Sequence, residues 1–557
     1  MAQARNSIDE LLQSLSRGSL SRREFLQRAA LLGVSVSAAG SLLSACGSGS
    51  SSSASPSVSA TAAGGKSLGT LNVRSTLEVG FLDPANWSSP VDVYTLDAIH
   101  EGLVSYKPGT WQVVNTLAET FEPSADGLSY HFVLKPGIQF HRGFGEVTAD
   151  DVKFSFERIA GLTKPKLAAA YQADWGALKE VKVASKYEGT IIMKTPFAPL
   201  MRSTLPVLSG KILSKKAVTQ LGSGYVRNPV GTGPYEFTQW IPKQKVVLTR
   251  FAGYSKANSA YAPPAAAAQI VFQEITDDGA AQTALEAGDL DFAQISTAYV
   301  KLLANSPKFN LSRMPSLNYE WVAMNVRDPF LSNINVRKAI RQAIDVPGIL
   351  EAAYNGVWPR ANAIIPQAMG LGYWPQAPAY NRDVAKAQAY MQAAGVSKAK
   401  VSLTIVDAAA DRTAAQVIQQ NLADIGLTVT INIQDAASFW AIPGNGGGGA
   451  KRQLVYNYYV TEPDPYWSME WWVTSQMNLW NWSEWSNKQF DSLFEQGAAT
   501  LDTAKRQQIY QQMQQIWDAD ANMVWIAFIT NPYAYKKSVA AVFRPDGDPM
   551  FWRFTGA

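Results

Sequence analysis

Short β-strand segments alternate with amphipathic helical segments along most of the chain, and this order limits most strongly how it can fold. Strands are predicted at 71–80, 246–251, 269–275, 319–326 and 427–433, where β-branched and aromatic residues cluster. Helices are predicted at 148–159, 280–290, 335–344 and 411–426, and around 487–500 and 503–520. Thr148 can cap the first of these helices, with Asp151 at the capping-box position. The repeated strand–helix–strand order predicts an α/β fold.

Glycine and proline sharpen several boundaries. The stretch 129–140, "SYHFVLKPGIQF", predicts a strand, a Pro-Gly turn and a second strand. Gly288 is predicted to end one helix, and Pro347 to open another as a first-turn proline. With roughly 150 residues per domain as a guide, a chain of 557 residues predicts three or four packed units.

Composition excludes several classes of protein. The 49 basic and 45 acidic residues are interspersed and give a net charge of only +4, which argues against nucleic-acid binding. A single cysteine excludes an internal disulfide framework. The three histidines, His100, His131 and His141, lack the spacing of a metal cluster, so no metal and no cofactor is predicted. No G-x-S-x-G elbow occurs, and no enzymatic activity is predicted.

The N-terminal region predicts export and anchoring. Arg22 and Arg23 lie in the stretch "SRREFL", which fits the twin-arginine export pattern, and an apolar segment follows at 29–43. The only cysteine, Cys46, comes next in "LSAC", which resembles the lipobox of bacterial lipoproteins. We therefore expect a signal peptide at 1–45, lipidation of Cys46 and a flexible tether at 46–66. The predicted location is the outer face of the cytoplasmic membrane, in a periplasm or at the cell surface.

Six segments, in order, resemble one protein family. They are 130–159, 228–240 with "GTGPY", 284–293 with "LEAGDLD", 324–345 with "VRKAIRQAID", 419–431 and 505–517. Together they resemble the solute-binding proteins of ABC importers in the peptide/nickel family, known as family 5. The resemblance implies a two-lobed periplasmic-binding-protein-like α/β fold with a hinge and an extra domain inserted in the first lobe.

That architecture places the domain boundaries along the chain. The first lobe is expected at 67–110, 228–318 and 523–557, the extra domain at 111–227, and the third domain, which forms the other lobe, at 319–522.

An aromatic tract at 456–485 is the best candidate for a ligand-contacting surface. In peptide binders of the family, an aspartate three residues before an acidic-Pro pair holds the amino group of the peptide. Glu462-Pro463 matches that pair, so Tyr459 occupies the position of the aspartate, and Glu462 or Asp464 could replace it. The predicted ligand-binding residues are Tyr459, Glu462, Asp464, Tyr466, Trp467 and Trp471, with Asp83 and Trp87 from the opposite side of the cleft and Asn325 near the hinge.

The same aromatic side chains allow two kinds of ligand. Tryptophan and tyrosine faces bind flat apolar surfaces, so an oligosaccharide is an alternative to a peptide. About half of these tryptophans are expected to be core packing instead.

These features predict a monomeric, lipid-anchored, substrate-binding subunit that delivers its ligand to ABC permease and ATPase subunits. A sensory or adhesive lipoprotein and a surface glycan hydrolase are the alternatives from other classes.

Overall fold

The computed structural model describes residues 66–254, 265–440 and 451–557. The predicted export arginines Arg22 and Arg23, the predicted lipidation site Cys46 and nearly all of the tether lie outside these residues.

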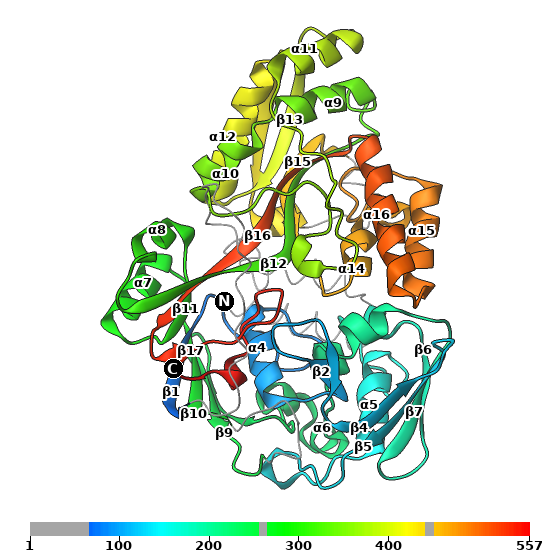
Figure 1. The fold of residues 1–557 in the computed structure, drawn as a ribbon, viewed down its shortest axis with the longest axis vertical. Coiled ribbons are helices and arrows are strands. Elements are labelled where there is room, and N and C mark those ends of the chain that lie inside the picture. Colours follow the sequence, from blue (N-terminus) through cyan, green and yellow to red (C-terminus); the bar gives the residue numbers. More distant parts are fainter. Residues whose placement is uncertain (1–65, 255–264, 441–450) are drawn as a thin grey trace.

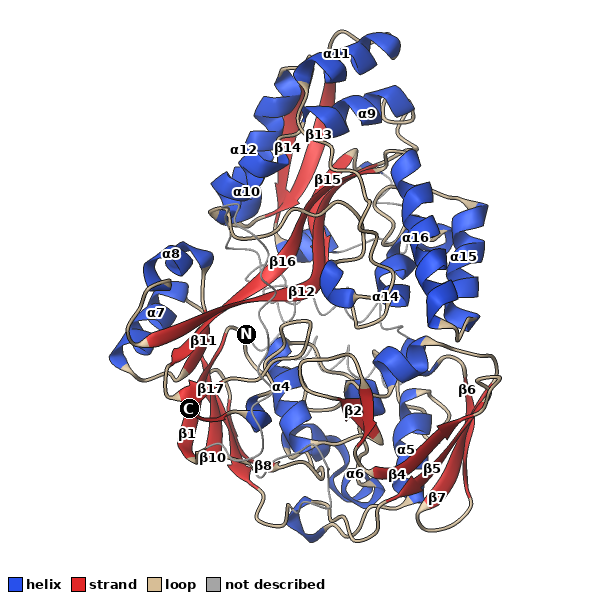
Figure 2. Cartoon of the chain, viewed as in Figure 1, coloured by secondary structure: helices blue, strands red, loops and turns tan. Residues whose placement is uncertain are grey.

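A single ten-stranded sheet runs through the molecule in the order β14-β13-β15-β12-β16-β11-β1-β10-β9-β8. Figures 1 and 2 show it passing through two lobes. We call residues 319–528 the upper lobe, and the described residues before 316 and after 529 the lower lobe. The upper lobe holds β13 (Ala399–Val406), β14 (Leu427–Gln434) and β15 (Leu454–Tyr459). The lower lobe holds β1 (Leu68–Ser75), β8 (Tyr235–Ile241), β9 (Lys245–Arg250), β10 (Ala267–Glu274) and β11 (Phe292–Gln294).

Two long antiparallel strands, β12 (Phe309–Met324) and β16 (Met523–Lys536), cross between the lobes. In the lower lobe Pro315 pairs with Thr530, and in the upper lobe Tyr319 pairs with Phe528. Three residues of β12, at 316–318, therefore oppose one residue of β16. Such a bulge bends the strand and redirects its side chains.

Helices cover both faces of the upper part of the sheet. One face packs on α9 (Ile334–Ala343), α10 (Val346–Tyr354), α11 (Val384–Ala393) and α12 (Ala409–Ala423). The other face packs on α13 (Ala436–Trp440), α14 (Pro465–Met469), α15 (Lys488–Ala499) and α16 (Thr503–Ala519). The predicted helices around 487–500 and 503–520 are thus confirmed as α15 and α16.

The lower lobe contains a smaller unit within residues 111–227, where the extra domain is predicted. Its antiparallel sheet has the order β4 (Ala118–Pro123), β5 (Ser129–Leu134), β7 (Glu188–Met193) and β6 (Leu178–Val183). This sheet packs on α5 (Ala149–Ile159), with α6 (Lys215–Leu221) alongside. The rest of the lobe includes α4 (Pro90–Ile99), α7 (Asp278–Ala287) and α8 (Val300–Leu303), and the small pairs β2 (Val104–Tyr106) with β3 (Val113–Asn115) and β17 (Val539–Ala540) with β18 (Thr555–Gly556).

Local sequence signals fixed several element ends. Thr148 and Asp151 form the predicted capping box at the start of α5. Gly288 ends α7 in the left-handed region at φ 91°, where a side chain would be strained.

The predicted strand after Gly137 is wrong: only a bridge from Gln139 to Glu146 forms. The apolar alternation there reflects the burial of two side chains, not pairing with a neighbouring strand.

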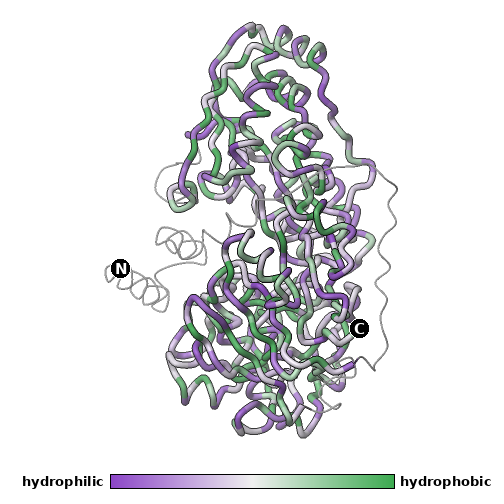
Figure 3. The backbone as a smooth tube through the Cα atoms, turned by 90° about the vertical axis from the view of Figure 1, so that its left-hand side faces the viewer, coloured by the Kyte–Doolittle hydropathy of each residue, from purple (hydrophilic) through white to green (hydrophobic). Residues whose placement is uncertain are grey.

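Hydrophobic stretches run through both lobes (Figure 3), and they build separate cores in the upper lobe, the extra domain and the remainder of the lower lobe. Within the described residues, no helix combines the length and apolar character needed to cross a bilayer.

Candidate ligand-binding site

A cavity of about 300 Å³ lies between the lobes, beside the crossing strands. The lower lobe contributes Trp87, Ser88, Ser89, Pro90, Val93, Tyr94, Tyr171, Asp174, Val207, Leu208, Ser209, Gln294, Arg544, Asp546 and Asp548. The upper lobe contributes Tyr458, Val460, Thr461, Glu462 and Pro463. The crossing itself contributes the bulge residues Ser316, Leu317 and Asn318, with Ile529 and Asn531 from β16. The β12 bulge thus presents side chains to the space between the lobes.

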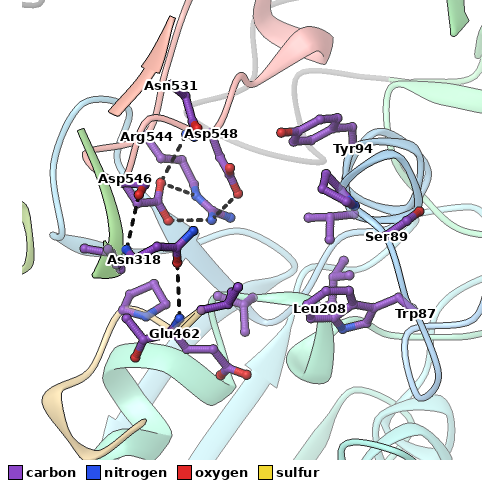
Figure 4. Close-up of a pocket in the computed structure, with 18 of the residues that line it drawn as sticks. Trp87, Ser89, Tyr94, Leu208, Asn318, Glu462, Asn531, Arg544, Asp546 and Asp548 are labelled. Atoms are coloured by element: carbon purple, nitrogen blue, oxygen red, sulfur yellow. Dashed lines mark hydrogen bonds and ion pairs between the residues drawn. The ribbon is translucent and has the colours of Figure 1, made fainter. Parts of the chain in front are cut away.

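One wall is aromatic and apolar. Trp87 lies with Tyr94 and Leu208 on the side opposite the charged residues (Figure 4). The Trp87 ring stacks on Tyr171, with centroids 4.6 Å apart and planes 8° from parallel. This wall offers a flat apolar surface to a ligand side chain.

A buried carboxylate holds the loop that carries Trp87. Asp92, in the first turn of α4, accepts hydrogen bonds from the backbone N–H groups of Gly80, Phe81, Ser88 and Ser89. Ser89 caps the helix in return, which completes a capping box. Burial raises the pKa of Asp92 despite these donors. The loop is therefore fixed by the local chemistry of the helix start.

The opposite wall is charged and comes from the C-terminal loop 544–548 (Figure 4). The Nη2 atom of Arg544 lies 2.6 Å from Asp546 Oδ2 and 2.7 Å from Asp548 Oδ2, and its Nη1 atom lies 3.8 Å from Asp97 Oδ2. Gly547 turns the loop at φ 82°, and a Cβ there would lie 2.7 Å from the carbonyl oxygen of Pro315. Glycine at this position lets the acidic loop lie directly against the start of the β12 bulge.

Asp546 and Asp548 share this one arginine, whereas Asp97 also pairs with Lys211, whose Nζ atom lies 2.7 Å from Asp97 Oδ1. Burial acts to lower the pKa of Arg544, but the carboxylates of Asp546 and Asp548 outweigh it and raise that pKa. Burial raises the pKa of Asp548 to about 7, although the charge of Arg544 opposes the change, and the neighbouring charges of Asp546 and Asp97 add to it. The wall therefore has more negative groups than Arg544 can neutralise.

The upper wall is the segment that follows β15. Thr461, Glu462 and Pro463 line the cavity, and the Thr461 N–H donates to Asn318 Oδ1 at 3.3 Å. With Asp174 from the lower lobe, the cavity is lined by four acidic residues and one arginine. A cationic group is the ligand feature that such a site favours.

Of the nine predicted ligand-binding residues, Trp87 and Glu462 line this cavity, and the other seven lie elsewhere. Tyr459 points to the opposite face of β15 from Tyr458, because side chains alternate along a strand. Its ring stacks on Trp471 in the α14–α16 core, with centroids 4.9 Å apart. Tyr466 stacks on Phe494 at 4.5 Å.

The remaining predicted residues make structural contacts. Trp467 is 2% exposed and packs into the core of the extra domain. Asp464 caps α14 and forms a buried two-pronged ion pair with Arg506, at 2.7 and 2.9 Å.

On the other side of the cleft, Asp83 forms a similar buried pair with Arg158, at 2.6 and 3.0 Å. Asn325 donates to the carbonyl of Arg452 and accepts from the N–H of Arg327 at the end of β12.

Sequence reasoning missed the charged loop and the bulge. The string "RPDGDP" at 544–549 is an acidic turn, and turns of this composition are common on surfaces. Only the tertiary structure places it against β12. Across the described residues, no group of three or more histidine, cysteine or acidic side chains is arranged to hold a metal ion.

Two α/β lobes joined by crossing strands, with a cavity between them, define the architecture of a binding protein that encloses its ligand. Comparison with known families agrees. The model of "Bacterial extracellular solute-binding proteins, family 5 Middle" matches residues 112–488, and the chain belongs to this family. The family is one of solute-binding proteins and not of enzymes, so the predicted class is confirmed.

Individual relatives share about a quarter of their residues with this chain. The chain is 26% identical over 463 residues to the glutathione-binding protein GsiB of Pectobacterium atrosepticum, covering 80% of this chain and 86% of the relative. It is 26% identical over 460 residues to the dipeptide-binding protein of Escherichia coli, covering 78% and 84%. The structure of HbpA2 from Haemophilus parasuis matches with a TM-score of 0.76 and 25% identity, covering 88% of this chain and all of that one. The predicted two-lobed fold is confirmed.

Proposed function

We propose that this protein is the substrate-binding subunit of an ABC importer, and that it captures short peptides or similar amine-bearing solutes in the cavity between its lobes. The observation that carries this proposal is the excess of acidic groups on the polar wall, opposite the apolar wall of Trp87 and Tyr94. The names of two relatives, a glutathione-binding and a dipeptide-binding protein, support the same class of ligand.

The charges of the cavity fit one end of a peptide. The two carboxylates of Asp546 and Asp548 exceed the single positive charge of Arg544 between them, so a ligand ammonium group would restore the balance. A cavity of about 300 Å³ is at the small end of ligand sites, which favours a ligand of two or three residues. Serine and asparagine side chains around the wall can bond the peptide backbone.

The tryptophan tract does not favour the oligosaccharide alternative. Trp467, Trp472, Trp482 and Trp485 are each no more than 4% exposed and pack in cores. Among the described residues that line the cavity, Trp87 is the one tryptophan, so this lining does not form the extended stacking platform that a sugar chain would need.

Transport requires three further steps, which we include in the proposal. The crossing strands β12 and β16 would act as the hinge on which the lobes close over ligand, since few other described strands connect the lobes. The twin-arginine pattern at Arg22 and Arg23 and the lipobox at Cys46 support export and anchoring. The closed form would then deliver its ligand to a membrane permease.

Titration calorimetry on the full chain with Cys46→Ser, unfolded and refolded to remove carried ligand, tests the ligand class. The panel is free di- and tripeptides, glutathione, their N-acetylated forms and cello-oligosaccharides. We expect binding of free peptides, and a loss of at least about tenfold in affinity on N-acetylation, as for an unpaired buried charge. Glu462→Gln should weaken binding, whereas the exposed Glu495→Gln should not. Binding of cello-oligosaccharides without binding of peptides would refute the proposal.

A further inference from the structure

The lobes meet at a second place, separate from the crossing strands. Arg202 lies in a π-helical turn of the extra domain, Leu200–Thr204. Its Nε atom donates to the carbonyl of Pro463 at 2.8 Å, and its Nη2 atom donates to the carbonyl of Met369. Both acceptors belong to the upper lobe, so one guanidinium group bridges the two lobes.

Other contacts surround this arginine. The Trp467 indole N–H donates to Ser203 Oγ at 2.7 Å, and its ring is buried in the lower-lobe core. The Trp111 indole N–H donates to the carbonyl of Ala368 at 2.8 Å. The guanidinium of Arg202 lies over the Trp111 ring, 5.7 Å from its centroid.

Backbone groups extend the same contact. The N–H of Ala198 donates to the carbonyl of Ala498 in α15, at 2.7 Å. Figure 1 shows α14 and α15 above the extra domain, to one side of the crossing of β12 and β16. We call the contacts of Trp111, Ala198, Arg202 and Ser203 with the upper lobe the interlobe bridge.

The interlobe bridge touches the cavity wall from outside. Arg202 is bonded to Pro463, which directly follows Glu462 and Thr461 in the wall, while Arg202 itself does not line the cavity. We infer that Arg202 is a positioning residue: it latches the 461–463 wall segment to the extra domain and so holds the lobes closed over the ligand. This inference rests on the proposed binding function, and extends it to the control of closure.

The chemistry of the bridge suits a reversible latch. The groups that accept hydrogen bonds from Arg202 here are the neutral carbonyl oxygens of Pro463 and Met369. Burial lowers the pKa of the Arg202 guanidinium, although the charge of Asp464 opposes that change. When the lobes separate, water can take the place of each carbonyl, so opening leaves no donor unsatisfied. A bridge of this kind can bias the closed state without making it permanent.

A latch affects ligand affinity through the population of the closed state. Apparent affinity scales with the fraction of the protein in the binding-competent form. Removing Arg202 should lower that fraction and release bound ligand faster, whereas the rate of encounter with the open lobes should change little.

The test measures opening directly. Cysteines replace Lys194 in the lower lobe and Lys505 in the upper lobe, both exposed, in the full chain with Cys46→Ser. Because Cys46 is the only native cysteine, a spin-label pair then reports a single interlobe distance. The variants are Arg202→Ala and Arg202→Lys. The matched control is Arg227→Ala, since Arg227 stacks on Trp240 at 4.0 Å within the lower lobe.

Without ligand, we expect Arg202→Ala to shift the distance distribution to longer values, Arg202→Lys to shift it less, and the control to match the parent. With a bound peptide, dissociation should become about tenfold faster in Arg202→Ala, with association within about threefold. If Arg202→Ala does not fold, Trp111→Phe removes one bridging donor and keeps an aromatic ring at that position, and it should show a shift in the same direction.

If Arg202→Ala folds and its interlobe distances are unchanged, Arg202 does not act as a latch. If the melting temperature falls while the distances and dissociation rates stay the same, the role of Arg202 is only structural, and this also overturns the latch. The distance measurement needs no ligand. If the protein with an intact Arg202 binds no peptide, the proposed function is refuted. The distance measurement would still decide whether Arg202 holds the lobes together.

Discussion

Binding of an amine-bearing ligand should release protons from Asp548. Burial, with the charges of Asp546 and Asp97, raises the pKa of this carboxyl to about 7, and Arg544 only partly opposes the change. Near pH 7 about half of the Asp548 groups are therefore protonated in the unliganded protein. A ligand ammonium within about 4–6 Å of a carboxyl lowers its pKa by about 1–3 units, so binding favours the ionised form.

The size of the effect follows from these values. With the pKa falling from about 7 to about 5 on binding, the protein releases about 0.5 proton per ligand at pH 7 and about 0.8 at pH 6. Affinity should then fall by about fourfold as the pH is lowered from about 7 to about 6. The ligand amino group, with an ordinary pKa of about 7.7–8.0, is already protonated in the acid part of this range, so the protons come from the protein.

Calorimetry in two buffers measures this release. At one pH, the heat of binding should differ between phosphate and Tris in proportion to the protons released. Asp548→Asn should remove most of that difference, because an amide does not titrate. Equal heats in both buffers between about pH 6 and pH 7 would refute the assignment of Asp548 to the ammonium end of the cavity.

Three further outcomes are expected. Burial raises the pKa of Glu320 to about 8 beside the Tyr354 hydroxyl, so its contribution to stability is full below its ordinary pKa and is lost as the pH rises through about 8. Glu320→Gln should flatten that loss in urea unfolding, and an unchanged pH slope would contradict it. Asp464→Asn should lower the free energy of unfolding by about 3–5 kcal/mol, because Arg506 is left buried without its ion pair; a loss below about 1 kcal/mol would contradict this. Trp87→Ala should weaken peptide binding by at least about 1 kcal/mol in titration calorimetry while the fold persists, and unchanged affinity would remove Trp87 from the site.

The fold was predictable because its signals are local. Thr148 and Asp151 form the capping box that marks the start of α5, and Gly288 marks the end of α7. Each signal lies within a few residues of the helix end that it marks. The stretch after Gly137 shows the limit of such signals. Ile138 and Phe140 alternate as in a strand and are both buried, yet strand formation also requires a neighbouring strand, which the local sequence does not specify.

The aromatic tract could not be interpreted in the same way. A tryptophan has the same local signature whether it faces a ligand or a core. Trp467 and Trp482 are 2% and 1% exposed, and each is fixed by partners far away in the sequence. Trp467, for example, donates to Ser203, which lies 264 residues earlier.

The cavity depends on a bulge that shifts three residues of β12 against one of β16. A regular pairing would continue the alternation of side chains from Pro315 to Tyr319, and Leu317 and Asn318 would then occupy ordinary positions on the two faces of the sheet. With the bulge, Leu317 and Asn318 both line the cavity, and Gly547 lets the acidic loop lie against Pro315. The strand that joins the lobes therefore also forms part of the cavity wall. A change in its bend would move Asn318, and with it the Thr461 backbone that it accepts from, so the path of β12 between the lobes and the shape of the cavity wall are coupled through one short segment.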